Sequence, residues 1–219
     1  SLSFPEPRTL IDPAEDRRLH FAGDQARAQR LLEEVLLVPV AASLRTLKLR
    51  SLYARLSALD PVVPLLSADF LAALPARCPR LTSLDLSHNN FGGTIPTQLA
   101  QLTSLESLKL TGNQLSGSLP TVIGRLTHLR ALYLSNNKLT GNLPTELGRL
   151  TELKALAVYD NAFHNAVPSE LGRLTRLTYC YLSQWKPGAD TFSCPLPTLP
   201  EACEAPQCEY SPPAPPSLP

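Results

Sequence analysis

Several residue types that often mark a function are scarce in this chain. Its 219 residues include four histidines, one tryptophan and no methionine, and charged residues make up only 18%. The 20 basic and 19 acidic residues almost cancel, so the chain has no excess charge to attract nucleic acid or an anionic membrane surface. An apolar content of 43% is typical of a folded protein. We therefore expect a folded chain without a nucleic-acid partner.

The chain lacks the sequences that a membrane-spanning segment and N-linked glycosylation need. The longest apolar run, residues 35–42, contains Pro39 and is far below the ~20 residues that span a bilayer. No Asn-x-Ser/Thr sequence occurs, so no asparagine can receive an ordinary glycan. The absence of methionine predicts a chain whose N-terminus has been processed. We expect no direct membrane insertion, and a location that is secreted or in the lumen or stroma of an organelle.

A repeat with a period of about 24 residues is the main feature that the sequence does contain. Four segments align without gaps, and each places leucines at alternating positions before a fixed asparagine and a fixed proline. Alternating leucines predict a short strand with one buried face. Because one repeat cannot bury its own leucines, we expect the repeats to stack around a continuous core. The segments begin at Leu81, Leu105, Leu129 and Leu153, and their prolines are Pro96, Pro120, Pro144 and Pro168.

From residue 81 to 177 the chain resembles the plant-type leucine-rich repeat, LxxLxLxxNxLxGxIPxxLGxL. The resemblance implies an α/β repeat solenoid that binds another macromolecule and is not an enzyme. Imperfect copies at 44–52 and 177–182 add one strand at each end, so we expect about six parallel strands on a concave face. Secreted relatives usually have a pair of cysteines in the N-terminal cap. This chain departs from them, because it has no cysteine before Cys78.

The pattern divides the chain into three parts. Residues 1–43 are expected to form an N-terminal cap with an amphipathic helix at 24–37, and residues 44–185 the solenoid. A second helix is predicted from residue 67, ending at Pro75. Residues 186–219 are rich in proline and cysteine, and we expect them to form a C-terminal cap and an extended tail. The tail serves either as a linker or as a segment that docks on a partner.

Equivalent positions of successive repeats form columns, and three of these columns indicate structural roles. The asparagine column follows each strand, where its amides can pair with backbone groups at the turn, so we interpret it as a structural ladder. It comprises Asn89, Asn113, Asn137 and Asn161. Gly93, Gly117 and Gly141 suit a left-handed backbone, and Asn165 replaces the fourth glycine. On the convex side, Arg125, Arg149 and Arg173 align, and Glu146 and Glu170 stand three residues ahead of two of them, which predicts a ridge of ion pairs.

The cysteines predict one crosslink near the C-terminus. Cys180 occupies a leucine position of the last strand and is expected to be a buried apolar residue, and Cys78 is also expected to be structural. Cys194, Cys203 and Cys208 can form one disulfide in three ways. A zinc site is disfavoured because no histidine follows His164, and we expect no metal and no cofactor.

A cluster of tyrosines is the best candidate for a binding surface. The residues between and after the strand leucines form three columns that are predicted to face solvent, the third being Arg50, Ser87, Thr111, Ser135, Tyr159 and Ser183. Four tyrosines fall in these columns, over small residues such as Ala155 and Ala157. Tyrosine is enriched at binding hot spots, although it also suits β-structure in general. The predicted patch is Tyr133, Tyr159, Tyr179 and Tyr181.

Other functions are less consistent with the sequence. Asp85, Ser87 and His88 are close in sequence, but alternate strand residues stand about 6.6 Å apart, which does not suit a catalytic triad. An ice-binding solenoid needs a regular array of threonine or asparagine, whereas these columns are mixed. Two hypotheses remain: a module that binds a protein or peptide through its concave face, and an accessory subunit docked into a larger assembly, such as one on an organellar membrane, by its caps and proline-rich tail.

Overall fold

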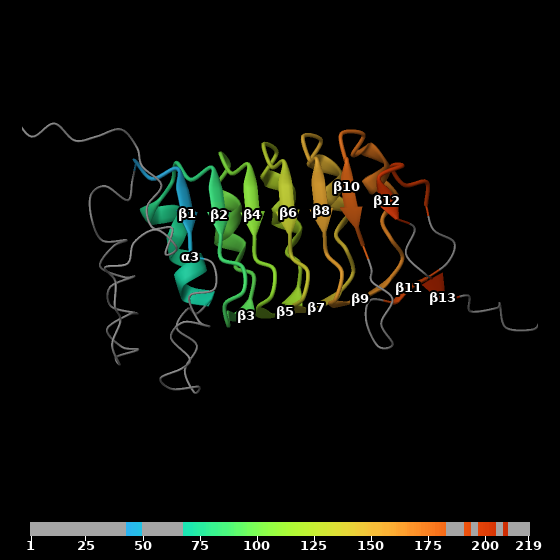
Figure 1. The fold of residues 1–219 in the computed structure, drawn as a ribbon, viewed down its shortest axis with the longest axis horizontal. Helices are drawn as coiled ribbons and strands as arrows, with labels where there is room; N and C mark the ends of the chain where they lie inside the picture. Colours follow the sequence, from blue (N-terminus) through green and yellow to red (C-terminus); the bar gives the residue numbers. More distant parts are fainter. Residues whose placement is uncertain (1–42, 50–67, 183–190, 194–196, 205–207, 210–219) are drawn as a thin grey trace, which may run out of the picture.

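Two parallel sheets and a row of short helices form a coil with the period of the sequence repeat. The computed structural model describes residues 43–49, 68–182, 191–193, 197–204 and 208–209. Its first sheet has seven strands lying side by side (Figure 1), in the order β1 (Thr46–Lys48), β2 (Ser83–Asp85), β4 (Ser107–Lys109), β6 (Ala131–Tyr133), β8 (Ala155–Ala157), β10 (Tyr179–Tyr181) and β12 (Cys203–Glu204). We call the outer, solvent-facing side of this sheet the sheet face.

The register of the first sheet follows the repeat. Leu84 pairs with Leu108, Leu108 with Leu132 and Leu132 with Leu156, so each leucine lies beside its equivalent in the next repeat. The parallel solenoid predicted from the leucine spacing is therefore confirmed. The sheet holds one strand more than predicted, because β12 adds to β10 after the leucine pattern has ended.

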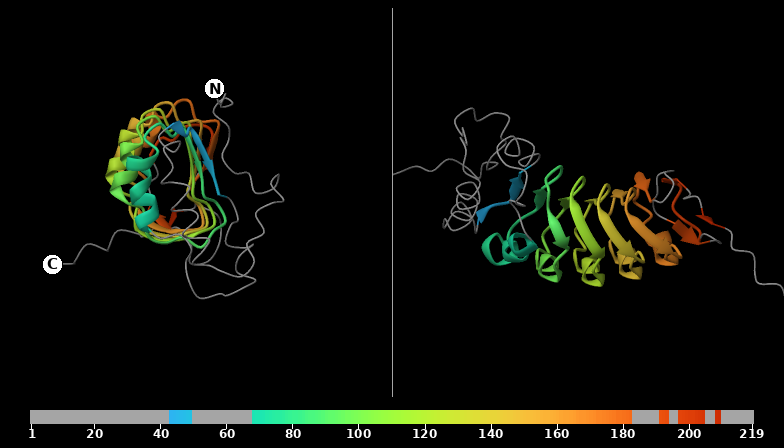
Figure 2. Two further views of the ribbon diagram at one scale, coloured as in Figure 1. Left: turned by 90° about the vertical axis from the view of Figure 1, so that its left-hand side faces the viewer. Right: turned by 90° about the horizontal axis from the view of Figure 1, so that it is seen from below.

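A second parallel sheet was not predicted. Its six strands have the order β13 (Cys208–Glu209), β11 (Thr191–Ser193), β9 (Ala162–Asn165), β7 (Lys138–Gly141), β5 (Gln114–Ser118) and β3 (Gly92–Thr94). Seen along the solenoid, the strands and the helices line different sides of the coil (Figure 2). The predicted left-handed positions are confirmed, since φ is +81° at Gly93 and +68° at Asn165. These sharp turns help to bring the chain out of the second sheet.

Short helices return the chain along the side opposite the sheet face. Four 3₁₀ helices, η2 (Thr97–Gln101), η3 (Thr121–Arg125), η4 (Thr145–Arg149) and η5 (Ser169–Arg173), each follow one of the repeat prolines. Pro144, for example, has φ −71° and ψ 138°, an extended conformation that its ring favours. Each repeat proline therefore stands at the start of a return segment.

The helix predicted to end at Pro75 continues past it. Helix α3 spans Ala68–Arg77 and contains Pro75. Proline costs about 3 kcal/mol inside a helix because it removes one hydrogen bond and crowds the preceding turn. Here Leu71, Leu74 and Cys78 are fully buried, and the Cys78 amide donates to the Leu74 carbonyl, so burial on both sides of the proline stabilises the final turn.

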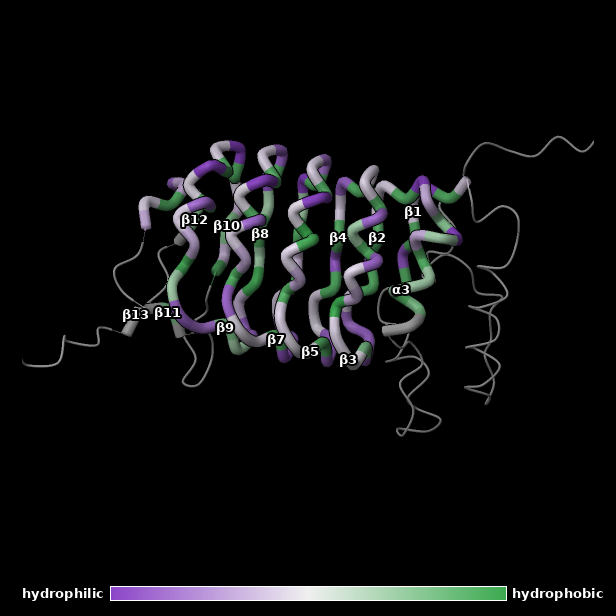
Figure 3. Tube along the Cα trace, turned by 180° about the vertical axis from the view of Figure 1, so that it is seen from behind, coloured by the Kyte–Doolittle hydropathy of each residue, from purple (hydrophilic) through white to green (hydrophobic). Residues whose placement is uncertain are grey.

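A single apolar core runs through the coils. Its members include the strand leucines Leu84, Leu108, Leu132 and Leu156, and Phe91 and Phe163 pack beneath the second sheet. Apolar and polar segments alternate within every coil (Figure 3), as expected when each repeat buries one side of its strand. The predicted helix at 24–37, Trp185 and the segment 210–219 lie outside the described residues.

Candidate partner-binding surface

The four predicted tyrosines form one connected group of rings on the sheet face. We call Tyr133, Tyr159, Tyr179 and Tyr181 the aromatic cluster. The ring centroids of Tyr179 and Tyr181 are 4.6 Å apart, those of Tyr133 and Tyr179 6.0 Å, and those of Tyr159 and Tyr181 6.3 Å. Tyr133 and Tyr179 come from β6 and β10, so their contact passes over the strand between them, β8. The cluster therefore spans three strands without a gap.

Small residues beneath the rings form a buried floor. Ala155 and Ala157 of β8 are only 9% and 2% exposed, and Ser135 is 1% exposed. Their columns were predicted to face solvent, so for these three residues, and for Ser87 at 5%, the prediction is wrong. At Ala155 and Ala157 the physical reason is that large neighbouring rings lean across a strand whose own side chains are too short to reach past them. The tyrosines take the solvent-exposed position, and Tyr179 is the most open at 40%.

Charged groups border the cluster at its N-terminal side. The Lys109 ammonium lies 5.4 Å from the centroid of the Tyr133 ring, within the range of a cation–π contact. Lys109 belongs to β4, and Asp85 and Lys48 occupy the same column on β2 and β1. Glu106 and Arg130 form an ion pair of 3.4 Å beside this column. The sheet face is thus polar over β1–β4 and aromatic over β6–β10.

The asparagine column is the structural ladder that was predicted. Each of the four amides donates to backbone carbonyl groups in its own coil and in the previous one. The side-chain oxygens also accept backbone amides of the previous coil: Asn113 accepts from Phe91, Asn137 from Leu115 and Asn161 from Leu139. These side chains lie inside the turns and are unavailable to a partner.

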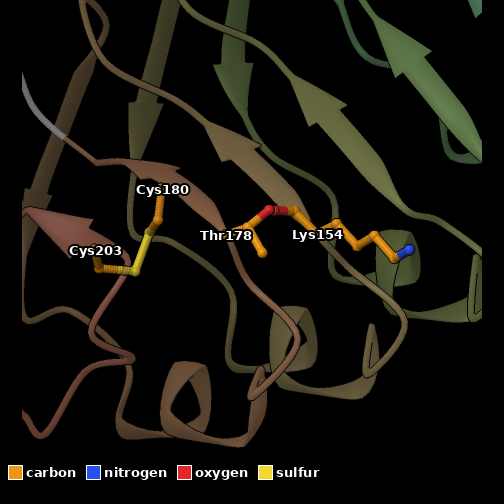
Figure 4. Close-up of a disulfide and its surroundings, with 4 residues drawn as sticks. All are labelled: Lys154, Thr178, Cys180 and Cys203. Atoms are coloured by element: carbon orange, nitrogen blue, oxygen red, sulfur yellow. A yellow bond between two sulfur atoms is a disulfide. The ribbon is translucent and has the colours of Figure 1, made fainter.

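Two of the three predicted disulfide pairings, those that include Cys203, are wrong. Cys203 is bonded to Cys180, which sequence reasoning had assigned to the core as a buried thiol (Figure 4). The two residues are direct neighbours in the parallel pair of β10 and β12, with Cα atoms 4.4 Å apart. Loop spacing alone could not reveal this pairing, because the strand β12 has no leucine pattern. The side chain of Cys208 and the whole of Cys194 lie outside the description.

Cys78 is a free and buried thiol, as expected of a structural residue. Burial raises the pKa of this thiol above its ordinary value, while the neighbouring Arg77 acts in the opposite direction. A thiol that is buried and protonated is a poor nucleophile. Cys78 therefore packs in the core between α3 and the first regular repeat.

The convex arginine column does not form the predicted ridge. Within the described residues, the two ion pairs join Arg130 to Glu106 and Arg176 to Glu152, and each links equivalent positions of successive coils. Glu146 and Glu170 instead accept hydrogen bonds from the hydroxyl groups of Thr145 and Ser169. On a 3₁₀ helix, residues three apart are eclipsed. The ion pairs expected within each helix, from glutamate to the arginine three residues later, are thus replaced by ion pairs between neighbouring coils.

No helix in the described part of the chain is both long and apolar enough to cross a bilayer. Residues 79–139 match the family described as leucine rich repeat. Comparison with curated proteins gives no match.

Solved structures from Arabidopsis thaliana share the fold. The crystal structure of the BIR3–SERK2 complex is 39% identical over 54% of this chain, with a TM-score of 0.50. The ectodomain of the receptor kinase HAESA, solved with an N-terminally extended IDA peptide hormone, is 33% identical over 74% of this chain, with a TM-score of 0.56. The HAESA complex with IDA and the co-receptor SERK1 is 30% identical over 70%, with a TM-score of 0.54.

The matches span only part of these structures. They cover 61% of the matched BIR3–SERK2 chain and 24% and 28% of the two HAESA chains. The likeness therefore concerns a run of repeats. Taken with the register of the first sheet, in which each strand pairs with its equivalent in the next repeat, the matches show that this chain is a plant-type leucine-rich-repeat protein.

Proposed function

We propose that this protein binds a protein or peptide partner through its sheet face, with the aromatic cluster at the centre of the contact. The observation behind the proposal is that four tyrosines, three of them from β6 and β10 and one from the turn after β8, touch one another over a buried floor of small residues. Mutual contact fixes the rings before a partner arrives, so little side-chain entropy is lost on binding. Tyrosine also offers a large apolar area with a polar tip.

Similar proteins support binding over catalysis. The HAESA structures contain a peptide hormone, and one also contains a co-receptor protein. The leucine-rich repeat is a fold whose extended surface generally serves interaction. The aromatic cluster has tilted rings and mixed neighbours, which is unlike the regular hydroxyl array that ice binding needs.

The disulfide supports an oxidising location. Disulfides persist in secreted proteins and other oxidising compartments and are rare in the cytosol. Cys180 and Cys203 form such a bond at the C-terminal end of the solenoid. We propose that the protein is secreted or resides in the lumen of an organelle.

A displayed library of random peptides, selected on the immobilised protein, tests the proposed site. Tyr159→Ala with Tyr181→Ala should weaken the selected peptides at least about tenfold, since hot-spot residues each contribute more than about 1 kcal/mol. The matched pair Tyr159→Phe and Tyr181→Phe keeps both rings and should retain most of the affinity. Thermal melting of each variant confirms that it is folded. Peptides that bind all three proteins equally would show that the aromatic cluster is not the binding site.

The alternative role as a docked subunit needs a separate test. A deletion from residue 187 would remove β11, β12 and Cys203, and would damage the end of the solenoid itself. Removing only residues 210–219 spares every described element. If assembly into a larger complex is lost on this deletion while peptide binding persists, the tail and not the sheet face docks the protein.

A further inference from the structure

The aromatic cluster has a spacing that suits one peptide conformation. Adjacent strands of a sheet are about 4.8 Å apart, so β6 and β10, which flank β8, are separated by about 9.6 Å. A polyproline II helix has three residues per turn and a rise of about 3.1 Å per residue, so residues i and i+3 lie on one side about 9.3 Å apart. A polyproline II segment that crosses the strands therefore places i over β6 and i+3 over β10.

The tilt of the rings provides the contacts that such a segment needs. The planes of Tyr133 and Tyr179 are inclined by 50°, and those of Tyr159 and Tyr181 by 70°. Rings inclined in this way present both faces and edges to a partner instead of one flat platform. Proline-rich segments are typically recognised by docking into aromatic-lined grooves, because their conformation is already fixed before binding.

The chain itself contains a matching sequence. Residues 212–216 read Pro-Pro-Ala-Pro-Pro, so prolines recur at i and i+3 twice, as Pro212 with Pro215 and Pro213 with Pro216. Residues 210–219 include no charged side chain. An uncharged segment loses no ionic solvation when it settles on the aromatic part of the sheet face, and it leaves the charged part over β1–β4 uncovered.

We infer that the aromatic cluster binds residues 212–216 of a second copy of this protein, with Pro212 over β6 and Pro215 over β10. This inference rests on the proposed function of the sheet face. The same chain cannot supply the segment in this register. Two residues separate Glu209 from Pro212, and the three steps along the chain reach about 11 Å at most. From β12, the last strand of its sheet, to β6 there are three strand spacings, or about 14 Å, before any path around the coil is added.

A complementation experiment with the full-length protein tests the inference. One variant has the face altered (Tyr159→Ala, Tyr181→Ala), and the other has the tail altered (Pro212→Ala, Pro213→Ala, Pro215→Ala, Pro216→Ala). Sedimentation equilibrium over a dilution series should show self-association of the wild type, and at least about tenfold weaker association of either variant alone. An equimolar mixture should form a one-to-one pair, since one variant supplies the tail and the other the face.

Two control variants accompany this experiment. Lys48→Ala, which alters an exposed side chain on β1 of the same face, should associate like the wild type. Tyr159→Phe with Tyr181→Phe should do so as well, which guards against loss of fold. Wild type that stays monomeric, a tail variant that still self-associates, or a mixture that stays monomeric would each overturn the inference. If library peptides nevertheless bind in a manner that depends on Tyr159 and Tyr181, the proposed function stands and only the identity of the occupant is wrong.

Discussion

At the scale of single residues, Asn113 shows how one side chain joins two coils. Its amide donates to the carbonyls of Leu110 at 2.8 Å and of Leu86 at 3.1 Å, and its oxygen accepts from the Phe91 amide at 3.1 Å. The Leu86 carbonyl also accepts from Asn89 and the Leu110 carbonyl from Asn137, so among these groups the Phe91 amide depends on Asn113 most directly. A buried backbone group without a hydrogen bond costs about 1–3 kcal/mol.

Replacing Asn113 by alanine should therefore be costly. We expect the free energy of unfolding to fall by about 1–3 kcal/mol, because the Phe91 amide loses this partner while the Leu86 and Leu110 carbonyls each lose one of two donors. Urea denaturation followed by circular dichroism measures the change. Asn142→Ala is the matched control, since Asn142 is exposed and contacts the exposed Asn165. An equal loss in both variants would contradict the ladder role.

Residue roles could be predicted where they recur in register. The asparagine column repeats four times before a turn, which is enough to infer its backbone partners. Cys180 was placed correctly in the core, but its partner Cys203 sits in a strand of two residues that only the stacking of coils creates. The burial of Ala155 and Ala157 was missed for a similar reason, since it depends on rings from neighbouring strands.

At the scale of elements, successive 3₁₀ helices pack so closely that a side chain at the contact position would collide with the neighbouring coil. A Cβ atom added to Gly148 in η4 would lie 2.5 Å from the Glu170 carbonyl oxygen and 2.6 Å from the Glu170 Cβ. Gly124 in η3 stands in the same relation to Glu146. Gly124 and Gly148 therefore set the distance between their coil and the next one on the helical side.

Gly148→Ala should destabilise the protein by about 1–3 kcal/mol, the usual cost of overpacking. The colliding atoms include backbone, so the neighbouring coil must shift as a whole. In Gly92→Ala, by contrast, the new Cβ meets nothing within 4 Å, and we expect no loss of stability. Comparing the two melting temperatures tests the idea. It fails if both substitutions are tolerated.

The second sheet could not be predicted from local pattern. Strand β3 reads Gly-Gly-Thr and β5 reads Gln-Leu-Ser-Gly-Ser, and neither has the alternation that marks a half-buried strand. Stacking at a constant period is what places these segments side by side, with Gly93 opposite Leu115 and Gly117 opposite Leu139. Pairing here follows from the repeat and not from strand propensity.

At the scale of the whole molecule, each coil contacts only its neighbours, so the ends of the stack decide much of its stability. The C-terminal end is closed by the Cys180–Cys203 bond between β10 and β12, 23 residues apart in sequence. By the chain-entropy argument, a crosslink over a loop of this length contributes about 3 kcal/mol.

Cys203→Ala should lower the free energy of unfolding by about 3 kcal/mol. Reduction of the wild type with dithiothreitol should produce a loss of similar size, and the variant should not respond to the reductant. Chemical denaturation with and without dithiothreitol gives all four values. A wild type whose stability is unchanged by reduction would show that the bond does not stabilise this end.

The position of this bond has one more consequence. A stack that is held together by contacts between neighbours unzips from its ends inward, and a covalent link stops that process where it lies. Cys180 stands between Tyr179 and Tyr181, so the unzipping of the C-terminal end halts at the border of the aromatic cluster. The redox state of the surroundings thereby governs how long the aromatic cluster stays intact when the C-terminal end opens.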